Sequence, residues 1–355
     1  MSWRAEAERL RQASGYVSGI SAREASRIAG RRRFVNLQSN ENLFVPSRIM
    51  EGLVRRALKD LDLRLYPKEV IEDLRNLIAE KEGLSADNVL LGHGADQLIE
   101  LILRAFGKDR SLLIHSPTYS YYQAAGIGIL RKVIEVEFED NERLNLRAIE
   151  RENPDLVFIC SPNNPTGGLV PEEDLKELLS FYRGLVVIDE TYAQIAGITY
   201  RDLIKSHDNV IVLRTFSKAF AMASFRIGYA MADRTIMEAL SRIQSPFPVA
   251  SLSAKVAYLA LKREAYFKGI WRKAIETRTW FEGRLSSKVR RTRSFTYFLT
   301  ISTERSSEEV FRALLKRGYI TRIIKPFRGF ENPVRLNVAP KGLIRDLPDA
   351  INELV

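Results

Sequence analysis

The residues with the most evident chemistry lie between positions 211 and 229. An apolar, β-branched run there ends in Thr215, Ser217 and Lys218, and Arg226 follows eight residues after the lysine. A lysine at the carboxyl end of a buried strand is poorly solvated, which lowers its pKa and leaves a nucleophilic amine. The two hydroxyls and the guanidinium are donors suited to a phosphate. A Schiff-base site for pyridoxal 5'-phosphate (PLP) requires this combination, whereas a lysine that caps the next helix or faces solvent is the alternative.

A second candidate group lies in the segment LVVIDETY. Asp189 ends its apolar run, and Tyr192 follows three residues later. In a PLP site the carboxylate would pair with the pyridinium nitrogen and keep the ring an electron sink, and the tyrosine could reach the phenolic oxygen of the cofactor. Capping of the next element by Asp189 and ordinary packing of Tyr192 are the alternatives.

A glycine-rich turn after the apolar run Val89–Leu91 reads Gly-His-Gly-Ala-Asp-Gln and opens a helical pattern. Glycines let the backbone approach a phosphate, and the amides of Ala95 and Asp96 would face it at the helix N-terminus. The turn also suits a dinucleotide, but that site needs an acidic residue at a strand end about twenty residues later. The corresponding segment, RSLLIHSP, has no such residue. The dinucleotide interpretation is therefore the weaker one.

Two further turns follow apolar runs. In SPNNPTGG, which comes after a run ending at Cys160, the amide of Asn164 could donate to the ring oxygen of the cofactor. In SPTYS, Tyr119 could stack on a flat ring. A simple turn and ordinary aromatic packing are the respective alternatives.

These groups need a scaffold that brings strand ends together. The expected strands are Val89–Leu91, Ser111–His115, Lys132–Glu137, Leu156–Cys160, Leu185–Asp189, Val210–Arg214 and Gly228–Ala232. Helical patterns between them, such as Ala95–Ala105 and Pro171–Tyr182, favour an α/β fold with a mainly parallel sheet covered on both faces. Gly228–Ala232 follows Lys218 too closely for a βαβ crossover, so we expect it to run antiparallel. A doubly wound sheet places its site at the carboxyl ends of its strands, beside which the candidates above fall.

The C-terminal third has a different pattern. A long helical region, about 249–284, precedes a small α+β domain with expected strands at Thr296–Ser302, Tyr319–Lys325 and Val334–Val338. Its expected helices are Ser307–Arg317 and Leu347–Leu354. We therefore expect an N-terminal arm (1–34) that joins the small domain, a large cofactor-binding domain (35–248), and a connecting helix with the small domain (249–355).

Composition argues against several classes of protein. The 355 residues are 45% hydrophobic and 28% charged, as in soluble proteins with more than one packed unit. We expect no membrane span and no export, because no apolar run approaches ~20 residues and the N-terminal sequence MSWRAEAERLRQ carries charges. A single cysteine suits the reducing cytoplasm, and three histidines with one cysteine argue against a nitrogen/sulfur metal site. The net charge of +11 comes without a nucleic-acid module, so we expect no nucleic-acid partner.

The order of these segments carries a family resemblance. GxGAD, SPTYxxY, SPNNPTG, IDETY, TFSKAF and RIGY occur in one chain, each beside an expected strand end. The chain thereby resembles the class I/II aminotransferases of PLP-transferase fold type I. It is most similar to the histidinol-phosphate aminotransferase branch, through GYVSGISAREASRIAG leading into NLQSNENLFVPS, through RLYPKE, and through the SKAF spelling around the lysine. The resemblance covers the chain from about Tyr16 to Leu354.

The resemblance implies a role for each candidate. Lys218 would be the Schiff-base lysine, Asp189 the pyridinium partner and Tyr119 the stacking ring. Asn164 and Tyr192 would contact the phenolic oxygen. The phosphate would be held by Ala95, Asp96, Thr215, Ser217 and Arg226. Tyr66 in RLYPKE would reach the cofactor of a neighbouring subunit, which implies a homodimer. The substrate-binding residues would be Arg335, Arg322, Asn40 and Glu41.

The implied activity is transamination between histidinol phosphate and 2-oxoglutarate in histidine biosynthesis. Leu43 replaces a proline of the resembled family, a change expected to affect only loop stiffness. Three other departures bear on the substrate: Tyr297 stands where the family has an asparagine, Asn337 begins a segment that differs after Arg335, and residues 221–225 are bulkier than the family's small residues after the lysine. Threonine-phosphate decarboxylase and an aminotransferase for aromatic or other amino acids therefore remain alternatives. A non-catalytic PLP-fold binding protein is the alternative from a different class.

Overall fold

The computed structural model describes residues 2–355, and its largest sheet has seven strands in the order β2-β8-β7-β6-β5-β3-β4. The strands are β2 (Val89–Gly92), β3 (Ser111–Ser116), β4 (Lys132–Glu137), β5 (Leu156–Cys160), β6 (Leu185–Asp189), β7 (Val210–Thr215) and β8 (Gly228–Ala232). All neighbours from β4 to β7 pair in parallel, whereas β8 runs antiparallel to both β7 and β2. The predicted α/β fold, its strands and the antiparallel direction of β8 are confirmed.

The central strands are apolar on both faces because helices cover both. In β5, Val157 and Ile159 belong to one hydrophobic cluster, while Phe158 and Cys160 belong to another. This alternation follows from the two-residue period of a strand. The helices around this sheet are α4 (Lys68–Glu82), α5 (Gly94–Phe106), α6 (Tyr121–Ala125), α7 (Leu146–Glu152), α8 (Glu172–Phe181), α9 (Ala193–Ala196), α10 (Phe216–Ala219) and α11 (Arg234–Ile243), whereas α3 (Ser47–Lys59) packs against helix α12 (Ser251–Lys262).

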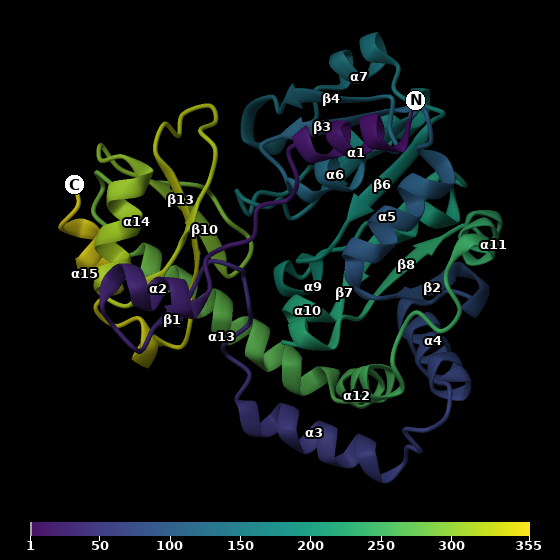
Figure 1. Ribbon diagram of the computed structural model, residues 1–355, viewed down its shortest axis with the longest axis horizontal. Helices are drawn as coiled ribbons and strands as arrows, with labels where there is room; N and C mark the ends of the chain where they lie inside the picture. The colour runs from purple at the N-terminus through teal and green to yellow at the C-terminus, as the bar shows by residue number, and fades with distance from the viewer. Residues whose placement is uncertain (1) are drawn as a thin grey trace.

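A smaller sheet lies beside the C-terminal end of the long helix α13 (Glu264–Glu282), apart from the large sheet, as Figure 1 shows. Its strands are β9 (Arg290–Arg291), β10 (Phe298–Ser302), β12 (Arg322–Ile323) and β13 (Pro333–Asn337), in the antiparallel order β12-β13-β10-β9. The remaining helices of this part are α14 (Ser307–Lys316) and α15 (Leu347–Asn352). Helix α12 (Ser251–Lys262) precedes α13, so the expected helical region is interrupted at Arg263.

The expected strand Tyr319–Lys325 is wrong in its extent. The chain divides it into β11 (Tyr319–Ile320), which pairs in parallel with β1 (Val35–Asn36), and β12, which pairs with β13. One straight strand cannot pair with both β1 and β13, which belong to different sheets. The sequence pattern alone does not reveal the second partner.

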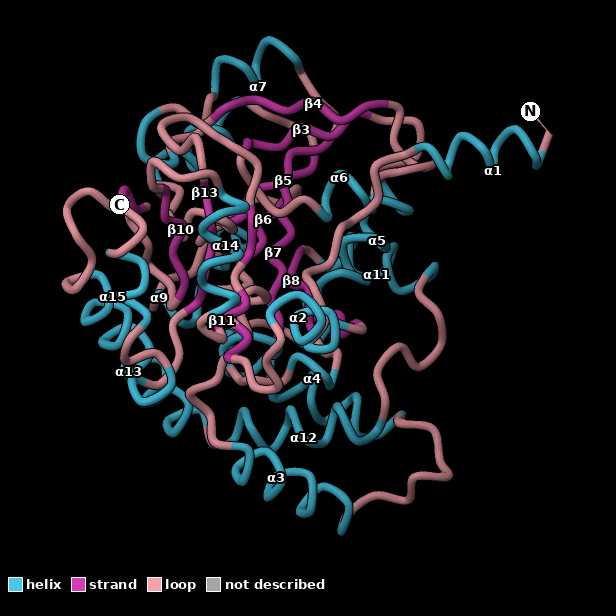
Figure 2. The backbone as a smooth tube through the Cα atoms, turned by 60° about the vertical axis from the view of Figure 1, so that its left-hand side comes forward, coloured by secondary structure: helices cyan, strands magenta, loops and turns pink. Residues whose placement is uncertain are grey.

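The N-terminal segment has two helices with different surroundings. Helix α2 (Ala22–Ala29) lies near α14 and buries Ala25. Helix α1 (Trp3–Gln12) buries none of its residues and projects from the body of the molecule in Figure 2. Among the described residues, no helix is long and apolar enough to cross a membrane.

Candidate active site

The lysine predicted to be the nucleophile lies just beyond β7, in α10. Its Nζ donates a hydrogen bond to the carbonyl oxygen of Ser39 at 2.7 Å. Burial lowers the pKa of Lys218 to about 8, and the positive charge of Arg335 adds to that effect. The amine is therefore much more readily neutral than an ordinary lysine, as a nucleophile must be.

The carboxylate of Asp189 lies at the end of β6 and is buried. It accepts hydrogen bonds from the hydroxyls of Tyr122 (2.7 Å) and Thr191 (2.6 Å) and from the amide of Thr191 (3.0 Å). Burial raises the pKa of this carboxyl, and the three hydrogen bonds oppose the change. Tyr122 was not among the predicted residues, although it ends the SPTYxxY pattern.

The start of α5 forms a cradle of closely approaching backbone. A Cβ atom added to Gly94 would lie 2.6 Å from Nη2 of Arg226, and one added to Gly228 would lie 2.8 Å from the amide nitrogen of Ala95. Gly94 also has a φ of +75°. Glycine is thus required at both positions, which lets an arginine and a helix N-terminus approach the same point. This donor set fits a phosphate group.

The remaining phosphate candidates lie beside that cradle. The hydroxyl of Thr215 donates to that of Ser217 at 2.9 Å. The carboxylate of Asp96 accepts from Nη2 of Arg226 at 2.9 Å and from the hydroxyl of Tyr119 at 3.1 Å. Asp96 thereby connects the phosphate candidates with the ring predicted to stack on the cofactor.

The substrate candidate Arg335 reaches the site from β13. Its guanidinium donates to Oδ1 of Asn164 and to the carbonyl oxygen of Gln38, while its Nε has no partner among the described residues. Burial lowers the pKa of this arginine. Arg322 lies directly opposite it in the β12–β13 register. Two guanidinium groups thus converge at the edge of the site.

Asn164 and Tyr192 were both predicted to contact one oxygen of the cofactor. In the structure Asn164 bonds to Arg335, whereas the Tyr192 hydroxyl accepts from Nδ2 of Asn40 at 2.9 Å. The last candidate, Glu41, accepts from Nδ2 of Asn36 at 2.9 Å. The structure brings Asn40 to the floor of the site, with Glu41 at its edge.

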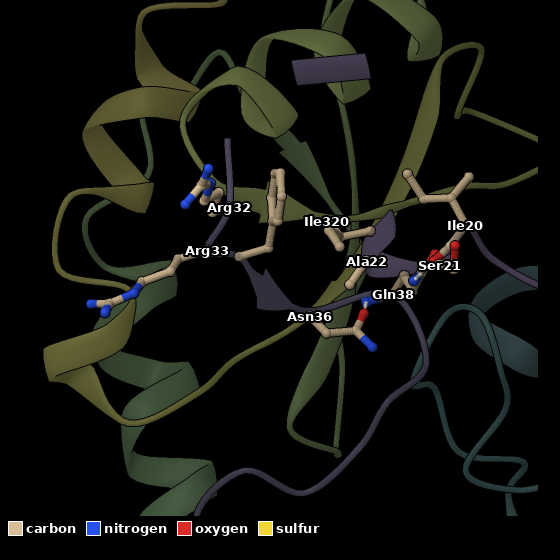
Figure 3. Close-up of a pocket in the computed structure, with 9 residues that line it drawn as sticks. Ile20, Ser21, Ala22, Arg32, Arg33, Asn36, Gln38 and Ile320 are labelled. Carbon is tan, nitrogen blue, oxygen red and sulfur yellow. Dashed lines mark hydrogen bonds between the residues drawn. The ribbon is translucent and has the colours of Figure 1, made fainter. Parts of the chain in front are cut away.

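The N-terminal segment crosses the mouth of the site. The ring of Tyr16 lies edge-on to Tyr119, with 6.0 Å between centroids, and the guanidinium of Arg322 donates to the carbonyl of Val17. Beyond it lies a cavity of about 490 Å³. Figure 3 shows the cavity's lining residues, including Gln38, whose carbonyl oxygen holds Arg335. The sequence marked this segment only as a family feature and gave no role to Tyr16.

The side chain of Tyr66 does not lie in the candidate site of its own chain. Its side chain is 80% exposed and stacks on Phe247 with 4.6 Å between ring centroids.

Comparison with known proteins agrees with this geometry. A model of the family "Aminotransferase class I and II" matches residues 32–352. The chain is 32% identical over 354 residues to the histidinol-phosphate aminotransferase of Methanothermobacter thermautotrophicus, covering 96% of this chain and 94% of that relative.

Solved structures share the fold. Histidinol-phosphate aminotransferase from Sinorhizobium meliloti, in complex with pyridoxal-5'-phosphate, has a TM-score of 0.85 at 24% identity over 98% of this chain and 97% of its own. L-threonine-O-3-phosphate decarboxylase from Porphyromonas gingivalis has a TM-score of 0.80 at 23% identity over 90% of this chain and 98% of its own. Because the family match spans nearly the whole chain and includes Lys218, Asp189 and Arg335, this chain belongs to the class I and II aminotransferases, which are PLP-dependent enzymes.

Proposed function

We propose that this enzyme transfers the amino group of histidinol phosphate to 2-oxoglutarate, as a step of histidine biosynthesis. The observation that carries the proposal is the register pair Arg322–Arg335 beside the lysine site. Like charges directly opposite one another destabilise a sheet, so the pair suits a site that receives an anionic substrate. The curated relatives named histidinol-phosphate aminotransferases, such as the one at 32% identity, support this choice of substrate.

PLP, the cofactor of this family, supplies an electron sink for the bond broken at the substrate's Cα. Lys218 would hold it covalently, and its amine, once released and neutral, would remove the Cα proton. Asp189 would keep the ring nitrogen protonated, Tyr119 would stack on the ring, and Tyr192 and Asn164 would contact its phenolic oxygen. The phosphate would lie on the cradle formed by Ala95, Asp96, Thr215, Ser217 and Arg226.

The substrates would be oriented by the arginines. A guanidinium is permanently charged and planar, so Arg335 suits both the phosphate of the donor and the carboxylate of 2-oxoglutarate. Arg322 adds a second positive charge, and Asn40 and Glu41 would also contact the donor. Because Asn164 and Gln38 already hold Arg335, its guanidinium is preorganised for either anion.

We further propose that the enzyme is a homodimer of the cytoplasm. The exposed Tyr66 lies on a segment that also exposes Leu63 and Leu65. Apolar side chains gathered on one surface indicate an interface, from which Tyr66 would reach the partner's cofactor phosphate. The buried free thiol of Cys160 suits a reducing compartment.

The experiment compares histidinol phosphate with histidinol, which lacks only the phosphate, as amino donors to 2-oxoglutarate. We expect kcat/KM to be roughly 10- to 150-fold higher for the phosphate ester, since one charge-assisted contact contributes roughly 1.5–3 kcal/mol. Arg322→Ala should remove most of this preference, whereas Arg328→Ala, at an arginine that is 71% exposed, should keep it. Equal use of both donors, faster use of an aromatic amino acid, or CO2 release from threonine phosphate would contradict the proposal.

A further inference from the structure

Tyr297, one of the departures noted in the family resemblance, has a specific partner in the structure. Its side chain is fully buried, and its hydroxyl donates a hydrogen bond of 2.6 Å to the main-chain carbonyl of Asn40. The two residues are 257 positions apart, so this bond connects the start of the small sheet with the floor of the site.

Asn40 needs such a constraint because its backbone is left-handed. Its φ is +52°, a region that asparagine tolerates better than most residues but that still costs free energy. Holding the carbonyl fixes the direction in which the side chain leaves the backbone. That side chain is 1% exposed and donates through Nδ2 to the hydroxyl of Tyr192 at 2.9 Å.

The direction of this bond matters for Tyr192. A phenolic hydroxyl has one proton and can also accept, and here its oxygen accepts from Asn40. Its own proton is therefore free to be donated elsewhere. Burial raises the pKa of Tyr192, with the nearby charge of Arg335 opposing, so the hydroxyl stays protonated. Phe298, the residue after Tyr297, fixes the ring edge-on at 4.8 Å.

We propose that Tyr297 is a positioning residue that acts through Asn40 to aim the hydroxyl of Tyr192 at the phenolic oxygen of bound PLP. This inference rests on the proposed function, in which PLP is held by Lys218. Tyr297 and Phe298 together define the direction of one donor: the first fixes Asn40 and the second fixes the ring of Tyr192.

The test measures the pH midpoint at which the visible absorption of the bound cofactor changes, in the holoenzyme. A donor to the phenolic oxygen withdraws charge from it and weakens its hold on the proton of the lysine–cofactor linkage. Tyr192→Phe should therefore raise the midpoint, and Tyr297→Phe should raise it in the same direction by about half to one unit, the equivalent of one hydrogen bond.

The matched control is Tyr182→Phe. Tyr182 is also buried and also donates to a main-chain carbonyl, that of Pro154 at 2.9 Å, but it lies in the covering layer away from the site. Tyr182→Phe should lower thermal stability as Tyr297→Phe does, but it should leave the pH midpoint of the cofactor absorption unchanged. Asn40→Gly keeps the left-handed backbone and removes only the side chain, and should raise the midpoint as well.

A double variant shows whether Tyr297 acts through Tyr192. If it does, Tyr192→Phe/Tyr297→Phe has the midpoint of Tyr192→Phe alone. Additive shifts, or an unchanged midpoint in Tyr297→Phe, would overturn the inference while leaving the proposed function intact. A wild-type protein that takes up no PLP would instead overturn the proposed function, and this assignment with it.

Discussion

At the scale of single residues, the pKa of Lys218 sets the pH dependence of cofactor capture. Its value of about 8 means that the amine is mostly protonated at lower pH and neutral above. The rate at which the apoprotein captures PLP should therefore rise about tenfold per pH unit below 8 and level off above it. Stopped-flow absorbance measures this rate. A rate that keeps rising toward pH 10 would show an ordinary lysine.

Sequence reasoning proposed site residues that carry their own chemical signal. Lys218, Asp189 and Arg226 each end or follow an apolar run, and strand ends converge in a parallel sheet. Sequence reasoning missed Tyr122, because the sequence cannot distinguish a tyrosine that donates a hydrogen bond to Asp189 from one that only packs in the core. Sequence reasoning could not find the hydrogen bond between Tyr297 and Asn40 either, because this bond joins two distant segments through a main-chain carbonyl.

At the scale of elements, the start of α5 depends on Gly94. Gly94→Ala should weaken PLP binding at least tenfold and destabilise the fold by about 1–2 kcal/mol, because alanine is strained at φ +75° and its Cβ would meet Arg226. Gly197→Ala is the control, since Gly197 has φ +74° but nothing within 4 Å. It should show a similar backbone cost with unchanged PLP affinity, as measured by urea unfolding and cofactor titration. Equal affinities in both variants would exclude the proposed cradle.

The ends of β6 and β7 are joined behind the site by a buried ionic network. Arg214 pairs with Glu82 at 2.6 Å and with Glu190 at 2.7 Å. In the sequence, Arg214 directly precedes Thr215 and Glu190 directly follows Asp189. Arg214→Met should cost about 3–5 kcal/mol at pH 7, because it leaves the buried Glu190 without its cation and Glu82 with Arg201 alone.

The pH dependence of that loss has a definite sign. Burial raises the pKa of the Glu190 carboxyl, and the charge of Arg214 opposes that rise. Without Arg214 the folded pKa of Glu190 lies above its unfolded value, so the variant loses stability as pH rises through the folded value. The loss of unfolding free energy in Arg214→Met should therefore be smaller at pH 5 than at pH 7. Arg201→Met removes a more exposed partner of Glu82 and should cost about 1 kcal/mol or less, as chemical unfolding at both pH values can show. A deficit independent of pH would mean that packing, not charge, explains the loss.

At the scale of the whole molecule, the exposed apolar segment around Tyr66 predicts a dimer. Leu65→Glu should produce monomers with weaker PLP binding, because a charge would be buried at the interface. Leu343→Glu is the control at another exposed leucine. Sedimentation equilibrium and cofactor titration measure both effects. A wild-type monomer that binds PLP tightly would contradict the dimer.

The large sheet could be predicted from the sequence because each of its strands is a short apolar run separated from the next. The small part could be predicted less well. The strand at Tyr319 divides between two partners, and the break at Arg263 has no proline or glycine to mark it. Local pattern records which residues are buried, whereas the identity of a distant partner depends on the whole chain.

The most direct test of the account is a single half-reaction. Histidinol phosphate is added to the PLP-loaded enzyme without any oxo acid, and the visible spectrum is recorded. We predict stoichiometric conversion of the cofactor to its amine form, reversed by 2-oxoglutarate. An unchanged spectrum with histidinol phosphate, in an enzyme that glutamate or an aromatic amino acid does convert, would contradict the proposed substrate.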